Sequence, residues 1–220
     1  MKKILLLAAL LFFVNTLSAQ LFNIAGHEIG FAYLGPKVGS TFSKITNTDN
    51  SKVRTGFQIG AVGEIGLTRS LSVESEITFI SKGVATDLYA TRVNYLSIPL
   101  LAKLSFRALG LSRVYATGGT YNNIRTNAKV VYDQQGQSFD ETHHYKTFDW
   151  GLALGAGAAY DTKYGLLCLD LRYDLGIVDI ARENTTSQRF TNRTLGAVLT
   201  FKYDAVDLFI RMRKKQADDN

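Results

Sequence analysis

Several residue types that would point to specific chemistry are scarce in this chain. It contains one Cys, three His and two Pro in 220 residues. A single Cys cannot form an internal disulfide, so a disulfide-stabilised scaffold is excluded. The few Cys and His residues also leave little for a metal cluster. We therefore expect no metal and no cofactor, and we expect no nucleic-acid partner.

Long apolar runs and helical periodicity are also lacking after the first twenty residues. Without an apolar run of eighteen or more residues, the sequence predicts no transmembrane helix. Apolar residues still make up 46% of the chain, which is too high a share for a disordered protein. What repeats instead is an alternation with a period of two residues, in blocks of about ten residues, which is typical of β-strands.

The start of the chain has the composition of a targeting segment. A basic start at Lys2 and Lys3 precedes the apolar run Ile4–Val14 and the short polar stretch Asn15–Ala19. This order predicts a secretory signal peptide over residues 1–19. We divide the remainder into a lead-in (residues 20–34), a barrel domain (residues 35–203) and a basic periplasmic tail (residues 204–220).

Eight alternating blocks make up the predicted barrel domain. In the clearest block, Phe57 and Ile59 lie on one face while Gln58 and Glu64 lie on the other. The predicted strands are Gly35–Ser43, Thr55–Leu67, Leu71–Lys82, Asn94–Phe106, Arg113–Tyr121, Phe148–Tyr160, Leu167–Leu175 and Leu195–Tyr203. Pro99 removes a ladder hydrogen bond inside the fourth strand, so we expect a bulge or bend there.

The connections between these strands alternate between long and short. The long ones are Lys44–Arg54, Gly83–Val93, Asn122–Thr147 and Gly176–Arg193. Outer-membrane barrels have long extracellular loops and short periplasmic turns. The sequence therefore predicts an all-β fold, an eight-stranded antiparallel up-and-down transmembrane β-barrel in the outer membrane of a Gram-negative bacterium.

A secreted β-sandwich is the alternative, and the polar faces of the strands argue against it. Residues 151–159 place Gly or Ala at every polar-face position, and small residues suit the crowded interior of a narrow barrel. Aromatic residues such as Phe106, Trp150 and Tyr203 gather near block ends, where barrels place their aromatic girdles.

A set of short motifs occurs in an order that resembles one family. The motifs are Gly35-Pro-Lys-Val-Gly39, Glu76 with Phe79 and Lys82-Gly83, Tyr95-Leu-Ser-Ile-Pro-Leu-Leu101, Phe148-Asp-Trp-Gly151, Gly155-Ala-Gly157, Leu171-Arg-Tyr-Asp-Leu-Gly176 and Asn192-Arg193. Over about residues 30–203 the chain resembles the PorT family, the outer membrane protein beta-barrel domain of Bacteroidetes. The resemblance implies an eight-stranded barrel and no reaction. The chain departs from the family pattern at Ser97, where an acidic residue is usual, and in the tail that follows Tyr203.

Charged residues on the polar faces form the first candidate site. Six acids and five bases are predicted to face the barrel interior: Lys37, Glu64, Glu74, Glu76, Lys82, Lys103, Asp149, Asp170, Arg172, Asp174 and Lys202. Side chains fill an eight-stranded barrel, and an unpaired buried charge is costly. We therefore expect these charges to pair and to plug the interior, with a narrow path for ions or small solutes as the alternative.

The second candidate is the segment Asp140, Glu141, His143 and His144 in the longest predicted loop. Two histidines beside two carboxylates could hold a divalent metal if the chain turns there, although a solvated loop is the simpler interpretation. With His27, these are the histidines available to a lipid-modifying enzyme.

Three function classes follow from these observations. The first is a non-enzymatic structural, interaction or secretion-accessory barrel, with outer-membrane lipid around it and a possible protein partner at its loops or C-terminal tail. The second is a narrow channel or small-solute transporter. The third, which we favour least, is a lipid-modifying enzyme.

Overall fold

The computed structural model describes residues 31–48, 50–108, 111–132, 138–182 and 188–205. The predicted signal peptide, residues 20–30 of the lead-in, His27 and the tail beyond Ala205 lie outside these residues. The elements are β1 (Phe31–Ile45), β2 (Arg54–Gly66), β3 (Leu71–Ala85), β4 (Tyr89–Ser97), β5 (Leu100–Ala108), β6 (Leu111–Tyr132), β7 (Ser138–Asp140), the 3₁₀ helix η1 (Thr142–His144), β8 (Phe148–Thr162), β9 (Gly165–Gly176) and β10 (Asn192–Asp204). No helix among the described residues is long and apolar enough to cross a membrane.

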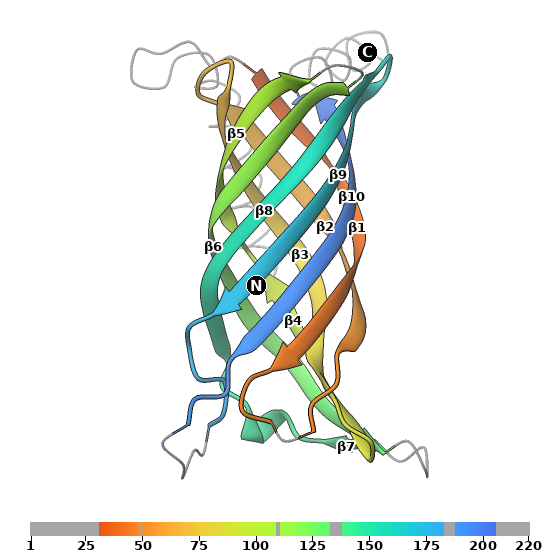
Figure 1. The fold of residues 1–220 in the computed structure, drawn as a ribbon, viewed down its shortest axis with the longest axis vertical. Helices are drawn as coiled ribbons and strands as arrows, with labels where there is room; N and C mark the ends of the chain where they lie inside the picture. Colours follow the sequence, from red (N-terminus) through yellow and green to blue (C-terminus); the bar gives the residue numbers. More distant parts are fainter. Residues whose placement is uncertain (1–30, 49, 109–110, 133–137, 183–187, 206–220) are drawn as a thin grey trace, which may run out of the picture.

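The strands close into an antiparallel barrel (Figure 1). β1 pairs with β2 on one side and with β10 on the other, which joins the two ends of the sheet. β4 and β5 follow one another along the same gap between β3 and β6, so together they serve as one strand of the barrel. The short β7 adds to β6 beyond the barrel wall. The predicted all-β up-and-down barrel is therefore confirmed.

The break between β4 and β5 falls at Ile98 and Pro99, where the sequence predicts a bulge or bend. Proline has no N–H to donate to the ladder, and the neighbouring groups make other bonds. The Ile98 N–H donates to the Asn122 carbonyl at 2.7 Å, and the Ser75 hydroxyl donates to the Pro99 carbonyl at 3.2 Å. The strand is therefore interrupted at Pro99, but the predicted bulge is absent, because the pairing with β3 and with β6 keeps one register from Ser97 to Leu100.

Two predicted loop boundaries are wrong. Gly83–Val93 is not a long loop, because β3 continues to Ala85 and β4 begins at Tyr89, and β6 runs to Tyr132 rather than ending at Tyr121. Strand pairing there continues in register from Tyr89 opposite Tyr132, with a shift at Asn94 and Tyr95. Apolar and polar residues must alternate only where one face of a strand contacts lipid. The parts of a strand that extend beyond the lipid therefore need no such pattern. β1 likewise begins at Phe31, inside the predicted lead-in.

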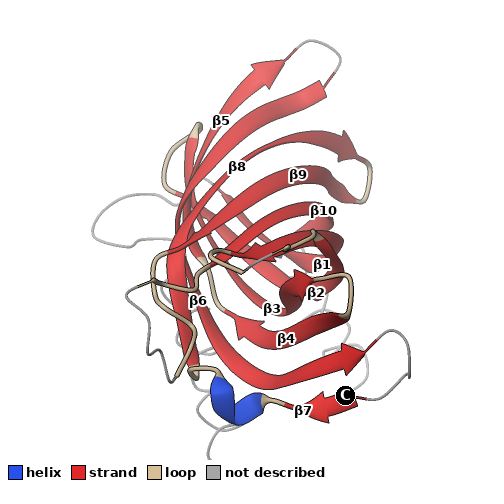
Figure 2. Ribbon diagram, turned by 60° about the horizontal axis from the view of Figure 1, so that its bottom comes forward, coloured by secondary structure: helices blue, strands red, loops and turns tan. Residues whose placement is uncertain are grey.

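The two ends of the barrel differ in the length of the connections that they carry. The turn end carries the β2–β3 and β8–β9 turns at residues 67–70 and 163–164. The loop end, at the bottom of Figure 1, carries β7, η1 and the β1–β2, β3–β4 and β9–β10 connections. Figure 2 brings the loop end forward and shows β7 and η1 beside the barrel mouth.

The outer face of the strands is apolar. Ile77, Leu154, Leu169 and Leu171 are each more than half exposed, as expected for side chains that contact lipid tails. Large aromatic side chains lie exposed toward both ends: Phe42, Phe57, Phe148 and Trp150 near the loop end, and Phe106, Tyr160, Tyr164 and Tyr203 near the turn end. These two groups correspond to the aromatic girdles of an outer-membrane barrel.

Candidate functional site: the charged interior and its two ends

A cluster of four charges lies inside the barrel near the turn end. The Lys202 ammonium contacts Glu64 at 2.6 Å and Glu74 at 2.5 Å, and the Lys103 ammonium contacts the same two carboxylates at 3.1 and 3.5 Å. Ser72 donates a hydrogen bond to Glu64 at 2.6 Å. All five side chains are buried and come from β2, β3, β5 and β10. Two acids thus neutralise two bases, and the cluster ties four strands together across the interior.

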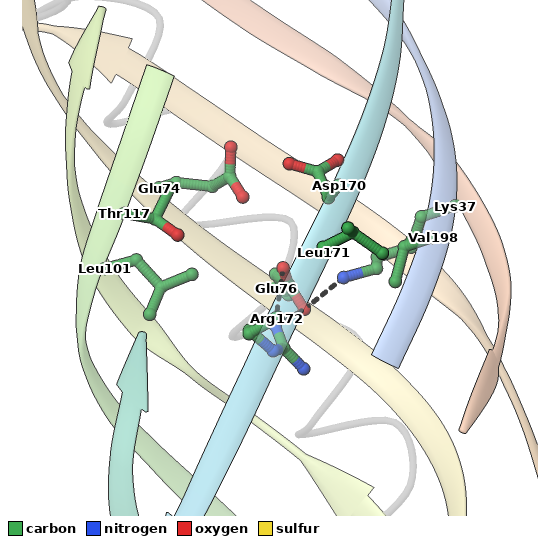
Figure 3. A pocket seen from close by; sticks show the side chains of 9 residues that line it. All are labelled: Lys37, Glu74, Glu76, Leu101, Thr117, Asp170, Leu171, Arg172 and Val198. Carbon is green, nitrogen blue, oxygen red and sulfur yellow. Dashed lines mark hydrogen bonds and ion pairs between the residues drawn. The ribbon is translucent and has the colours of Figure 1, made fainter. Parts of the chain in front are cut away.

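A second cluster lies in the middle of the barrel. Glu76 binds the Lys37 ammonium at 2.5 Å and the Arg172 guanidinium at 3.1 Å (Figure 3). Arg172 also contacts Asp174 at 3.1 Å, and Asp174 binds Lys82 at 2.9 Å. The five buried charges form a chain of alternating sign that connects β1, β3 and β9. Losing one member would leave a buried partner uncompensated, which typically costs about 3–5 kcal/mol.

Asp170 lies between the two clusters and accepts a hydrogen bond from the Tyr115 hydroxyl at 2.6 Å. Figure 3 shows Asp170 and Glu74 on one side of Glu76 and Arg172. The cavity among these side chains has a volume of about 10 Å³. That is close to the space that one water molecule needs.

Asp149 is fully buried and is held by neutral donors. It accepts hydrogen bonds from the Tyr121 hydroxyl at 3.1 Å and from the Asn123 and Asn192 amides at 3.0 and 2.8 Å. Asn192 also donates to the Tyr95 hydroxyl at 3.2 Å. Sequence reasoning missed these partners because it assigned Asn123 and Asn192 to loops. The signal was present in the spacing, since Tyr121 and Asn123 continue the inward-facing row of β6.

The predicted interior charges are therefore distributed over three sets of contacts. Nine of them belong to the two ion-pair clusters, and the other two, Asp149 and Asp170, accept hydrogen bonds from neutral groups. Every one of the nine is buried. The interior thus contains four acids and five bases that form ion pairs with one another, and the remaining two acids accept hydrogen bonds from neutral groups.

Apolar side chains lie at each end of this polar interior. Tyr145 packs against two buried clusters at the loop end, one containing Val93 and Tyr95 and the other containing Ile45 and Ile180. We call the two clusters, together with Tyr145 and Phe190, the loop-end plug; its members are Ile45, Ile80, Val84, Val93, Tyr95, Ala128, Tyr145, Ile180 and Phe190. Toward the turn end a smaller cluster contains Tyr115, Ala159, Leu166 and Cys168. The Cys168 thiol is free and buried.

The predicted loop site lies on β7, the residue after it, and η1. The His144 imidazole contacts Glu141 at 2.5 Å, while the Asp140 carboxylate accepts a hydrogen bond from the Thr142 N–H at 2.8 Å. Hydrogen bonding by the Thr142 side chain and, to a smaller extent, by its backbone N–H lowers the pKa of Asp140 below its usual value. His143 and His144 are both exposed. Within the described ranges, no group of three or more His, Cys, Asp or Glu side chains is arranged to hold a metal ion.

Comparison with solved structures gives several barrels of low sequence identity. Neisserial surface protein A matches with a TM-score of 0.53 and 13% identity, over 81% of this chain and 99% of that chain. The attachment invasion locus protein Ail of Yersinia pestis matches with a TM-score of 0.43 and 15% identity, over 79% and 98%. OprG of Pseudomonas aeruginosa matches with a TM-score of 0.43 and 14% identity, over 83% and 100%. Because the identity is only 13%, the match to Neisserial surface protein A supports the fold and says nothing of function.

Comparison with curated proteins finds no match. Comparison with protein families finds one that covers residues 19–182, described as the outer membrane protein beta-barrel domain. This match covers most of the chain, including most of the barrel wall from β1 to β9. Together with the closed sheet, the apolar outer face and the two aromatic girdles, it shows that the chain belongs to the outer membrane protein beta-barrel domain family.

Proposed function

We propose that this protein is a closed, non-enzymatic outer-membrane barrel that acts through its loop end by binding a protein partner. In this proposal it is exported with its signal peptide cleaved, and it serves a structural or secretion-accessory role of the PorT type. The observation that carries the proposal is the filling of the interior. Two ion-pair clusters occupy the polar interior, and the loop-end plug lies between them and the loop end.

The exposed apolar side chains of the loop end support a partner at this surface. Leu88 is 64% exposed and Val53 is 52% exposed. The two connections that carry them are joined, because the Lys52 N–H donates to the Ala85 carbonyl at 2.7 Å and Lys52 pairs with Asp87.

Charged side chains near these connections indicate where the lipid ends. Arg92 lies opposite Lys129 in the β4–β6 ladder, and both side chains are exposed. Charged side chains at this level favour water over lipid tails, so Leu88 and Val53 lie beyond the lipid-facing band. A contiguous exposed apolar surface favours protein–protein contact, and in this proposal the joined connections present Leu88 and Val53 as one such surface.

A photo-crosslinking experiment in the native membrane tests this proposal. A benzophenone amino acid replaces Leu88 in one variant and the lipid-facing Leu169, which is 58% exposed, in the control. We expect the probe at Leu88 to capture one protein at a fixed stoichiometry and the probe at Leu169 to capture lipid. The captured protein should also co-purify with the unmodified barrel and be lost from the Leu88→Asp variant. Equal captures at the two positions would contradict the proposal.

A further inference from the structure

A cavity lies at the loop end, where residues of the loop-end plug form part of its lining. Its volume is about 300 Å³, thirty times that of the interior cavity beside Arg172. Ile45 and Val84 at the ends of β1 and β3 form its apolar base, and Tyr89, Tyr145 and Phe190 contribute aromatic rings. This volume is at the lower end of the range of pockets that hold small organic ligands, about 300–1,000 Å³.

The rim of the cavity is held in place by backbone hydrogen bonds between connections that are distant in sequence. Tyr145 pairs with Ala181 in an isolated bridge, the Lys146 N–H donates to the Ile180 carbonyl at 2.7 Å, and the Arg182 N–H donates to the His144 carbonyl at 2.9 Å. The Ile180 N–H in turn donates to the Phe190 carbonyl at 2.8 Å. Residues 144–146 before β8 and residues 180–182 after β9 are therefore fixed to each other. A ligand would enter a preformed site and would lose little affinity to ordering these loops.

The polar groups of the lining suit an uncharged ligand. None of the described lining residues is Asp, Glu, Lys or Arg, and the lining His144 is already bound by Glu141, so a charged ligand would find no free opposite charge in the wall. Thr48, Thr91 and His144 offer hydrogen-bonding atoms, and His144 is itself held by Glu141. Burial raises the pKa of Tyr145, whose hydroxyl group therefore stays neutral. An apolar body with one hydrogen-bonding end matches this mixture of surfaces.

An aromatic row continues from the cavity wall outward along β4, β6 and β7. The Tyr89 and Tyr132 ring centroids are 5.9 Å apart, and Tyr132 makes an edge contact with Phe139 at 5.9 Å. Tyr132 and Phe139 remain 42% and 49% exposed. Aromatic rings interact favourably with further rings at these separations. The row therefore provides additional surface next to the cavity that an aromatic molecule can contact.

We propose that this cavity binds a small uncharged molecule with a single aromatic ring and a hydroxyl or similar hydrogen-bonding end. The ring lies against Tyr89, Tyr145 and Phe190, and the polar end reaches Thr91 or His144. The loop-end plug forms the base of the site, so the molecule is bound and is not passed through the barrel. This inference goes beyond the proposed protein partner and does not depend on it, because the cavity and the exposed Leu88 are separate features.

Fluorine NMR with 4-fluorophenol as the probe tests the site on the purified barrel in lipid nanodiscs. We expect saturable binding at one site per barrel, above the uptake by empty nanodiscs. Ala181→Trp places an indole in the cavity and should weaken binding at least about tenfold, a difference of roughly 1.4 kcal/mol. The matched control Leu169→Trp adds the same side chain at an exposed position on the lipid-facing wall, outside the lining, and should leave binding unchanged.

A second variant keeps the test valid if Ala181→Trp does not fold. Thr48→Trp fills the cavity from the β1–β2 connection, and heat-modifiable gel mobility reports whether each barrel is folded.

A charged probe tests whether the site prefers uncharged ligands. The probe 4-fluorobenzoate should bind at least about tenfold more weakly than 4-fluorophenol. Uptake that follows the lipid content alone, or saturable binding that both folded cavity-filling variants retain, would overturn the proposal.

Discussion

The two faces of the barrel wall follow different rules, although they alternate along the same strands. Ile77 on the outer face needs no specific partner, because lipid tails surround it whatever its exact shape. Glu76, the preceding residue, is buried and is bound by Lys37 and Arg172 within 3.1 Å. An apolar side chain in lipid tolerates change, whereas a buried charge depends on each of its partners. Neighbouring residues of one strand should therefore differ greatly in their sensitivity to substitution.

The largest expected difference is between Glu76→Gln and Ile77→Val. The first leaves Lys37 and Arg172 without a full countercharge and should lower the free energy of unfolding by about 3–5 kcal/mol. The second removes one methylene group from the lipid-facing side and should cost about 0.8 kcal/mol. Urea titration of the barrel folded into lipid vesicles measures both. Equal losses in the free energy of unfolding would contradict the expected contribution of the ion-pair chain to stability.

Glycines on the two faces should show a smaller difference. A Cβ atom on the inward-facing Gly157 would lie 2.5 Å from the Tyr115 ring, and Tyr115 holds Asp170. A Cβ atom on Gly118 would meet its nearest neighbour, a Leu154 methyl group, at 3.5 Å. We expect Gly157→Ala to cost about 1–3 kcal/mol through overpacking. Gly118→Ala should be neutral or slightly stabilising. The same urea titration would contradict this account if the two substitutions had equal effects.

The smallest expected effect lies at the loop end, where Asp140 is fully exposed. Its hydrogen bonds with Thr142 favour the ionised form, so the pKa of Asp140 lies below the ordinary value. Any stability that these bonds contribute is present above the ordinary pKa and is lost as pH falls through the folded-state value. Removing the hydroxyl in Thr142→Ala should raise the pKa of Asp140 toward the ordinary value, as measured by NMR titration of the carboxyl group. Thr126→Ala, a hydroxyl on the neighbouring β6, should leave it unchanged.

The sequence was most informative where the strands meet lipid. The alternation in β8 and β9 located both strands to within two residues, and Pro99 marked the break between β4 and β5. Beyond the lipid the alternation ends, so the outer half of β6 was read as a loop. Much of the pairing that extends β6 is with β4, from which it is distant in the chain: Tyr95 lies opposite Arg125, and Tyr89 lies opposite Tyr132. A sequence pattern in one segment does not reveal such pairings.

The same limit applied to the candidate site. Inward-facing charges such as Glu64 and Arg172 were found from the period of two, because they lie in strands that contact lipid. The pairing of Lys37 with Glu76 depends on the register of β1, β2 and β3, which the sequence does not state. The partners of Asp149 and the loop-end cavity depend on connections folding over one another. These features required the three-dimensional structure.

The charged interior and the loop-end plug should together close the barrel to ions. Single-channel recording of the purified protein in a planar bilayer measures this closure. We expect no discrete conductance for the unmodified barrel across the voltages that the bilayer withstands. A stable conductance whose ion selectivity changes in Glu76→Gln or Arg172→Gln would contradict it and would make the protein a narrow channel.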